Sequence, residues 1–246
     1  MRSDFSFELS GNDVHIWTLP TGGADDLVAR LERVLDAEEL NRAARFRFNH
    51  LRESFVVSHG ALRTLLGRYL NVPPAEVRFV YGSKGKPALA LQSNIEFNMT
   101  HSGGLAVIAL TLDREIGVDV EQIRSMPDRQ AIASRFFCAE EAAEILSLPE
   151  AERERAFYCC WTRKEAYIKA IGDGLSTPLD EFRVTVQPGE PARFVHIARD
   201  TEAAEAWMLH DLRLAPDYAA ALAYRDRERP LRLRRIVDVG EFAGRP

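Results

Sequence analysis

The sequence predicts an α+β protein built from two similar halves, and two observations support this fold class. Each half contains a block of helical patterns and a block of strand patterns, an order that favours segregated layers. Residues 35–39 (LDAEE) resemble residues 137–141 (FCAEE), and each segment precedes a long helical pattern. The two halves are expected to span residues 1–112 and 113–246. Chance similarity between two helix starts is the alternative explanation.

The composition indicates a globular chain with ample material for a core. Of 246 residues, 46% are hydrophobic and 28% are charged, an ordinary balance for one large domain or two small ones. The net charge of −5 argues against a nucleic-acid-binding protein, whose surface would be basic. No apolar run approaches the roughly 20 residues that a membrane-spanning helix needs, so no membrane association is expected.

Three cysteines, Cys138, Cys159 and Cys160, give an odd count with two adjacent positions. This pattern matches neither a disulfide framework nor a zinc site, and it favours buried, reduced thiols. The first residues also lack the long apolar core of a signal peptide. A cytoplasmic protein is therefore expected.

The first half is expected to open with a strand and continue with helices. Residues 14–19 alternate in hydrophobicity, which is typical of a half-buried strand. Asp25 or Asp26 could cap a helix that runs to about residue 34, and Asp36 could cap a second helix. Residues 55–70 carry an apolar stripe at helical spacing, which predicts a third helix. Three strands are then expected, at residues 77–81, 95–99 and 105–112.

The second half is expected to begin with a strand at residues 116–121, in a hairpin with residues 105–112. Three helices follow, at about residues 128–137, 140–146 and 152–171, and Gly172 and Gly174 stop the last of them. Three strands are expected after the helices, at residues 182–186, 206–214 and 219–224. The arginine-rich residues 225–235 are interleaved with acidic residues, which predicts a solvated surface segment.

Two carboxylates on one predicted strand and a third on a predicted helix form a candidate centre. Asp119 and Glu121 are two residues apart on the strand, which places both on one face. Glu165 shares a helical stripe with Lys164 and Lys169. Three carboxylates beside lysines indicate a magnesium site that handles phosphate, because Mg²⁺ takes oxygen ligands and leaves positions for phosphate. The alternatives are a solvated strand face and a surface salt bridge between Glu165 and Lys169.

Two loops and one helical region could contact an anion. Residues 97–104 (FNMTHSGG) end a strand in hydroxyls, His101 and two glycines, a set that can bind phosphate. A polar turn with a structural histidine is the alternative there. Lys84 and Lys86 stand in a short loop, where exposed lysines are also common. Six arginines make the first helical region cationic: Arg42, Arg45, Arg47, Arg52, Arg63 and Arg68.

The motifs of the commonest hydrolases, kinases and dehydrogenases are absent. Instead, the chain resembles the larger, Sfp-type (surfactin-synthetase-activating) class of 4′-phosphopantetheinyl transferases over about residues 40–185. The Gly-x-Asp-x-Glu block alone is weakly specific, but its pairing with the Trp-x-x-Lys-Glu block at this separation is strongly specific. Four blocks match in order: Gly85-Lys86-Pro87, residues 97–102, residues 117–121 (GVDVE), and Trp161-x-x-Lys164-Glu165 with Lys169.

The resemblance implies a pseudo-dimer of two α+β halves that holds coenzyme A in the cleft between them. It implies transfer of the 4′-phosphopantetheine arm of coenzyme A to a serine of an acyl or peptidyl carrier protein, with release of 3′,5′-ADP. A monomer is expected, because one chain already supplies both halves. The alternatives are a magnesium-dependent hydrolase of a coenzyme A or nucleotide pyrophosphate, and a binding module without catalysis.

The resemblance also implies roles for the candidate centre. Asp119, Glu121 and Glu165 are expected to hold Mg²⁺ against the pyrophosphate of the co-substrate. Glu165 is expected to act in addition as the general base that takes the proton of the carrier serine. Lys169 is expected to stabilise charge on the pyrophosphate, and Lys164 to assist it.

Binding residues for coenzyme A are implied in the same way. Thr100 and His101, helped by Arg42, are expected to bind the 3′-phosphate. The adenine side of the cleft is expected to be lined by Gly85, Lys86 and Pro87. One departure is Glu39, which stands where some members of the family carry a lysine.

Overall fold

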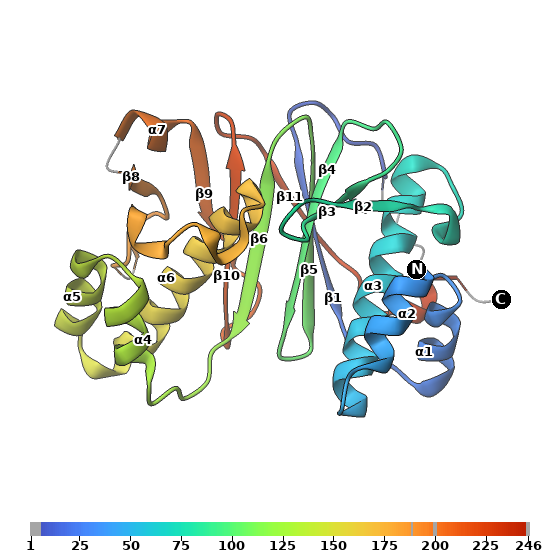
Figure 1. Ribbon diagram of the computed structural model, residues 1–246, viewed down its shortest axis with the longest axis horizontal. Coiled ribbons are helices and arrows are strands. Elements are labelled where there is room, and N and C mark those ends of the chain that lie inside the picture. The colour runs from blue at the N-terminus through green and yellow to red at the C-terminus, as the bar shows by residue number, and fades with distance from the viewer. Residues whose placement is uncertain (1–5, 188, 199–200, 245–246) are drawn as a thin grey trace.

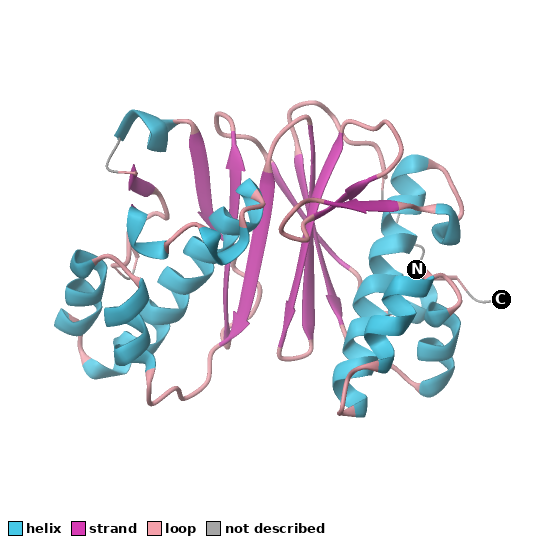
Figure 2. Cartoon of the chain, viewed as in Figure 1, coloured by secondary structure: helices cyan, strands magenta, loops and turns pink. Residues whose placement is uncertain are grey.

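The computed structural model describes residues 6–187, 189–198 and 201–244, whose helices and strands form four layers (Figure 1). Helices lie on the two outer sides, and two β-sheets face each other in the middle (Figure 2). This order of helix, sheet, sheet and helix confirms the predicted α+β class. In the described part of the chain, no helix is both long enough and apolar enough to cross a membrane.

The first half builds a four-stranded sheet covered by three helices. Its strands are β1 (Val14–Pro20), β4 (Ile95–Ser102), β5 (Leu105–Leu112) and β11 (Leu231–Arg235). They lie in the order β11-β1-β5-β4, and only the β1–β11 pair is parallel. Its helices are α1 (Asp25–Glu32), α2 (Ala37–Ala44) and α3 (Asn49–Leu70). Three smaller elements follow α3: the 3₁₀ helix η1 (Pro74–Glu76), and β2 (Phe79–Tyr81) paired with β3 (Pro87–Leu89).

The second half builds a three-stranded antiparallel sheet covered by three further helices. Its strands are β6 (Ile116–Gln122), β9 (Trp207–Asp211) and β10 (Tyr218–Arg225), in the order β6-β10-β9. Its helices are α4 (Arg129–Phe136), α5 (Ala139–Ser147) and α6 (Glu150–Ile171). Its smaller elements are the 3₁₀ helices η2 (Gly174–Ser176) and η3 (Leu179–Glu181), the strands β7 (Phe182–Val184) and β8 (Phe194–Ile197), and α7 (Thr201–Glu205).

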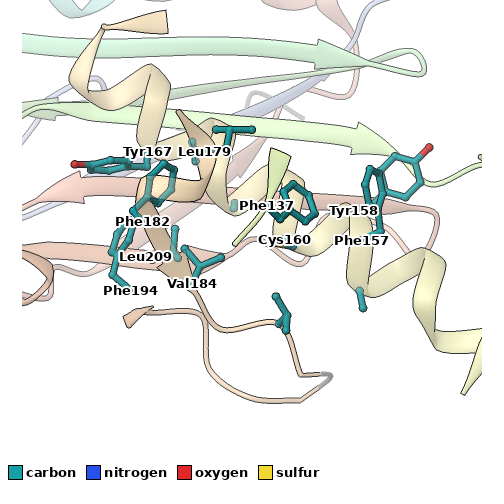
Figure 3. Close-up of a cluster of buried hydrophobic side chains, with 14 of the residues drawn as sticks. Phe137, Phe157, Tyr158, Cys160, Tyr167, Leu179, Phe182, Val184, Phe194 and Leu209 are labelled. Carbon is teal, nitrogen blue, oxygen red and sulfur yellow. The ribbon is translucent and has the colours of Figure 1, made fainter. Parts of the chain in front are cut away.

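Apolar cores separate the four layers, and strand alternation assigns each side chain to one of them. Leu222 of β10 faces the core between the two sheets, whereas Ala221 and Ala223 face α6. These small side chains let the helix lie close to the sheet. Aromatic and aliphatic side chains together fill the rest of this outer core (Figure 3), and the rings of Tyr167 and Phe182 are 4.8 Å apart.

Each half contains a buried ion pair, and the two ion pairs occupy matching positions. Glu39 accepts the N–H of the residue that caps α2 at 3.0 Å, and it accepts Arg63 Nε of α3 at 2.6 Å. Glu141 accepts the N–H of the residue that caps α5 at 2.9 Å, and it pairs with Lys164 Nζ of α6 at 2.9 Å. The long helices α3 and α6 both have 22 residues. Chance similarity of two helix starts does not explain this agreement, so the pseudo-dimer is confirmed.

The predicted hairpin between residues 105–112 and 116–121 is wrong. β6 pairs with β10, while β5 pairs with β1 and β4, because the chain passes from one sheet to the other after Asp113, which has φ +57°. β4 and β6 lie side by side where the sheets adjoin (Figure 1). There Asn98 Oδ1 accepts the backbone N–H of Val118 at 3.0 Å. Side chains thus link strands of the two halves where the sheets adjoin.

Several element limits also differ from the predictions. α3 begins at Asn49 rather than at residue 55. The hydrophobic pattern did not reveal its first turns, because they are exposed or half-buried and carry no apolar stripe. Asp25 lies inside α1 and does not cap it. β4 continues through the predicted polar turn as far as Ser102. Only Gly103 and Gly104 form the turn to β5, and both have the positive φ that a two-residue hairpin requires.

The C-terminal segment returns to the first half. β11 lies parallel to β1 at the edge of the first sheet, within the residues predicted to be a solvated segment. Ile236 follows it, and then α8 (Val239–Phe242), whose Phe242 ring lies 6.1 Å from that of Trp17. The boundary near residue 112 stays a prediction, but the first sheet is completed only by residues that lie far beyond it.

Candidate active site

Two hydroxyl side chains of β4 face two carboxylates of β6 across the junction between the halves. Thr100 donates to Asp119 Oδ1 at 3.1 Å, and Ser102 donates to Glu121 Oε2 at 2.7 Å. Strand alternation explains why both hydrogen bonds form on the same side. The two hydroxyl residues are two positions apart on β4, and the two carboxylates are two positions apart on β6, so each set shares one face of its strand. The Thr100 hydroxyl therefore orients a carboxylate, in addition to lining the cavity that lies beside it.

Helix α6 brings Glu165 and Lys169 to the same junction. It crosses β6 at Gly117, where an added Cβ atom would lie 2.1 Å from the carbonyl oxygen of Ala166. A side chain at residue 117 would push the helix away from the strand. The close approach places Lys169 Nζ 2.5 Å from Asp119 Oδ1. Four predicted residues, Asp119, Glu121, Glu165 and Lys169, are therefore brought together.

Asp119 has one carboxylate oxygen that no hydrogen-bond donor reaches. The side chain is buried, and its Oδ2 atom has no partner among the described residues. Desolvation raises the pKa of Asp119, Lys169 opposes that rise, and the nearby charge of Glu121 adds to it. A buried and unpaired carboxylate oxygen is unfavourable. A bound cation is the kind of partner that would satisfy it.

Glu165 shares this electrostatic environment. Desolvation raises its pKa, the charge of Asp119 raises it further, Lys169 opposes the rise, and Glu121 adds to it. The donor set therefore fits a hard divalent cation: three carboxylates that repel one another and one unsatisfied buried oxygen. Within the described ranges, however, no three His, Cys, Asp or Glu side chains stand ready at metal-binding geometry. The cationic partner that Asp119 has in the structure is Lys169.

A cavity of about 710 Å³ opens beside this cluster on the side of the first half. Its wall holds more basic than acidic side chains, which attracts anions. The basic ones are Arg42, Arg45, His59, His101 and Lys169, and the acidic ones are Glu38 and Glu39. Six of the residues that were predicted to bind a ligand line it: Arg42, Gly85, Pro87, Thr100, His101 and Lys169.

A second hollow, of about 280 Å³, continues the cavity toward the second half. It shares Gly85, Pro87 and Lys169 with the larger cavity, and it adds Glu165 of α6. Lys86 borders only this smaller hollow. The cleft therefore runs from the basic wall of the first half to the carboxylate cluster.

Two histidines line the cavity, and the sequence identified only His101 in advance. Desolvation, and then the nearby His59, lower the pKa of His101. His59 contacts Glu39 Oε1 through Nδ1 at 3.1 Å and stacks on Phe55 with the rings 3.9 Å apart. Phe55, His59 and Arg63 are spaced four residues apart, which places them on one face of α3. That spacing is the signal that could have identified His59.

Lys164 is not brought to the cleft. Its ammonium is buried in the second half, where it pairs with Glu141 and donates to the carbonyls of Leu179 and Phe182 at 2.7 and 2.6 Å. The spacing of Lys164 and Glu165 explains the difference, because consecutive helical residues are about 100° apart around the axis. We therefore leave Lys164 out of the candidate catalytic set.

Comparison with known protein families gives two matches on this chain. A family described as the 4′-phosphopantetheinyl transferase superfamily matches residues 115–223. A family described as 4′-phosphopantetheinyl transferase, N-terminal, matches residues 24–112. The two matched ranges adjoin at the segment where the chain passes from the first sheet to the second.

Individual relatives extend over most of the chain. The 4′-phosphopantetheinyl transferase HetI of Nostoc sp. strain PCC 7120 is 39% identical over 212 residues, which cover 85% of this chain and 85% of that protein. The 4′-phosphopantetheinyl transferase Sfp of Bacillus subtilis strain 168 is 34% identical, over 63% of this chain and 73% of that protein. The human L-aminoadipate-semialdehyde dehydrogenase-phosphopantetheinyl transferase is 28% identical, over 78% of this chain and 68% of that protein.

Proposed function

Because the chain belongs to the 4′-phosphopantetheinyl transferase superfamily, we propose that its cleft transfers the phosphopantetheine arm of coenzyme A to a serine of a carrier protein. The observation that carries the proposal is the cluster of Asp119, Glu121, Glu165 and Lys169 at the end of a basic cavity. An anionic co-substrate fits the cavity, and its pyrophosphate would reach the cluster.

The metal in this proposal is Mg²⁺, held by Asp119, Glu121 and Glu165. Support comes from the buried, unpartnered Oδ2 of Asp119 and from the carboxylates that surround it. When bound, Mg²⁺ supplies positive charge that stabilises a pyrophosphate undergoing substitution. Thr100 and Ser102 keep Asp119 and Glu121 in position through their hydroxyl hydrogen bonds.

Glu165 is the proposed general base. Its carboxylate borders the smaller hollow, and a carboxylate at that place can accept a hydroxyl proton. It takes the hydroxyl proton of the carrier serine while the serine oxygen forms a bond to the phosphorus that carries pantetheine. The bond from that phosphorus to the bridging oxygen breaks, and 3′,5′-ADP leaves with the added negative charge. Lys169 Nζ lies beside the cluster and stabilises that charge.

The cavity of the first half is proposed to hold the nucleotide of coenzyme A. Arg42 and His101 line its wall and would contact the 3′-phosphate. Thr100 would assist them while it orients Asp119. Gly85 and Pro87 would form the adenine side, because both border the cavity and its continuation.

The setting of the reaction is part of the same proposal. The partner is an acyl or peptidyl carrier protein, and no nucleic acid takes part, in keeping with the net charge of −5. A single chain supplies both halves of the cleft, which favours a monomer. Free thiols at Cys138, Cys159 and Cys160 suit a cytoplasmic location.

The test is the intact mass of an apo carrier protein after incubation with this protein, coenzyme A and Mg²⁺. We expect a gain of one phosphopantetheine unit, and no gain when a chelator removes the metal. A gain that persists in chelator would contradict the metal assignment. Release of 3′,5′-ADP without any carrier protein would favour the hydrolase alternative, and coenzyme A binding without turnover would favour a binding module.

A further inference from the structure

The ammonium group of Lys86 joins the two halves beside the cleft. Lys86 Nζ donates to the carbonyl oxygen of Ala170 at 2.7 Å and to that of Ile116 at 3.2 Å. Ala170 lies in the last turn of α6, and Ile116 is the first residue of β6. One lysine from the first half therefore holds both elements of the second half that carry the proposed metal ligands.

The end of α6 is suited to this contact. The last four carbonyls of a helix lack helical donors, and the helix dipole places negative charge there. Gly172 caps α6 with φ +77°, and a Cβ atom at this residue would lie 3.2 Å from Lys86 Cδ. Desolvation lowers the pKa of Lys86, so the two carbonyl acceptors offset an otherwise unfavourable burial.

Lys86 belongs to a tight turn that also forms a wall of the cleft. Gly82 N–H donates to the Lys86 carbonyl, and Gly85 N–H donates to the Gly82 carbonyl, both at 2.9 Å. Gly85 has φ +84°, a conformation that favours glycine. Gly85 and Pro87, on either side of Lys86, line both hollows. Because these backbone hydrogen bonds hold residues 82–86 together, an anchor on the Lys86 side chain also holds the neighbouring residues that form the wall.

We propose that Lys86 is a positioning residue that sets the placement of bound coenzyme A relative to Glu165 and Asp119. This inference rests on the proposed function. Gly85 and Pro87 form the wall against which the nucleotide would lie. Helix α6 carries Glu165 and Lys169, which would act at its pyrophosphate. The Lys86 ammonium ties the two together through protein carbonyls and makes no contact with the substrate. This replaces the expectation that Lys86 itself binds the adenine side.

The kinetic test compares Lys86→Met with Arg33→Met, which removes one positive charge from an exposed position that borders neither hollow. Misplacement of the substrate lowers kcat, so Lys86→Met should reduce kcat about 10- to 100-fold. The Kd of coenzyme A should change less than about threefold, because no substrate contact is lost. Arg33→Met should leave both quantities within about twofold, and Lys86→Arg, which keeps the donors, should recover much of kcat. A tenfold rise in Kd with unchanged kcat would show a substrate contact and overturn the proposal.

A second test needs no substrate. Backbone amides of residues 82–87 and 168–172 should exchange hydrogen faster in Lys86→Met than in the wild-type protein or in Arg33→Met. Equal exchange in all three proteins would mean that no tie exists, and it would overturn the proposal. Because this measurement does not depend on turnover, a wild-type protein that fails to modify any carrier protein would contradict the proposed function alone.

Discussion

Asp119 presents one oxygen to Lys169 and Thr100, and its other oxygen is buried with no donor from the part of the chain that the structure describes. A carboxylate removed from water in this way lowers stability unless it is fully paired. Proteins retain such groups mainly where the group binds something. At the scale of single residues, the same reasoning applies to Glu165, whose pKa is raised by burial and by its acidic neighbours.

Replacement of Glu165 by Gln should lower the rate of transfer about 10²- to 10⁴-fold, because the amide cannot take the serine proton. The fold should persist, since the side chain keeps its size. Single-turnover kinetics measures the rate, and thermal unfolding checks the fold. Glu152→Gln is the matched control, because Glu152 is exposed near the other end of the same helix. A near-normal rate for Glu165→Gln would remove Glu165 from the mechanism.

The lowered pKa of His15 predicts how the stability of the protein depends on pH. It is buried on β1, its Nδ1 lies 2.6 Å from the Tyr69 hydroxyl, and desolvation, then Arg234, lower its pKa from 6.5 to about 4. Below pH 6.5 the unfolded chain takes up a proton that the folded protein refuses until about pH 4. The free energy of unfolding should therefore fall as pH drops through this window, by up to about 3 kcal/mol.

Urea unfolding at several pH values measures this contribution of His15. The comparison is with His15→Asn, which keeps a polar side chain but does not titrate in the window. The variant should lose stability less steeply on acidification than the wild-type protein. Identical slopes for the two proteins would show that His15 does not carry the pH dependence.

At the scale of elements, the pair of Lys164 and Glu141 connects α6 to α5 as Arg63 and Glu39 connect α3 to α2. Lys164→Met should lower the free energy of unfolding by about 3–5 kcal/mol, because it leaves Glu141 buried and unpaired. The double variant Glu141→Gln with Lys164→Met should recover part of that loss. Denaturant unfolding measures both, and kcat of the folded single variant should stay within a few-fold of wild type. A large loss of kcat without loss of stability would return Lys164 to the active site.

Elements with a long hydrophobic period could be predicted from the sequence, and so could short strands that lie in apolar runs, such as β2 and β7. β1, β10 and α6 alternate or repeat over many residues, and all three were found. β8 and β11 were missed, and β11 (LRLRR) is mostly exposed at the edge of its sheet. A strand of that kind is defined by its partner rather than by its own pattern.

The same limit applies to the candidate site. Spacing could place Asp119 beside Glu121 and Lys169 beside Glu165, because each pair lies on one element. It could not show that Lys86 points at the end of α6, since that contact joins residues 84 positions apart. Long-range contacts of single side chains leave no periodic trace in the sequence.

At the scale of the whole molecule, removal of residues 231–246 should prevent the first half from folding. The deletion removes β11 and the buried side chains of Ile236, Val239 and Phe242. Burial of three such side chains is worth roughly 5–9 kcal/mol, which is comparable with the stability of a whole domain. The fraction of soluble protein and its thermal unfolding measure the effect.

A point substitution separates this core contribution from a general effect of altering the tail. Ile236→Ala should cost about 2–5 kcal/mol, whereas Val237→Ala, at a position that is 77% exposed, should cost less than about 0.5 kcal/mol. Equal stability of the two variants would mean that the tail does not belong to the first core. A soluble and cooperatively unfolding deletion variant would lead to the same conclusion.

The parallel pairing of β1 with β11 also sets the order in which the protein can mature on the ribosome. β1 is made early, and its partner β11 is made only after β6, α6, β9 and β10 of the second half. Pairings between such distant segments form slowly, because a long stretch of chain must first be brought together. The nascent first half must therefore wait with an open sheet edge until β11 has been made. The wall proposed to bind coenzyme A is consequently completed only after α6 and the sheet of the other half have been made.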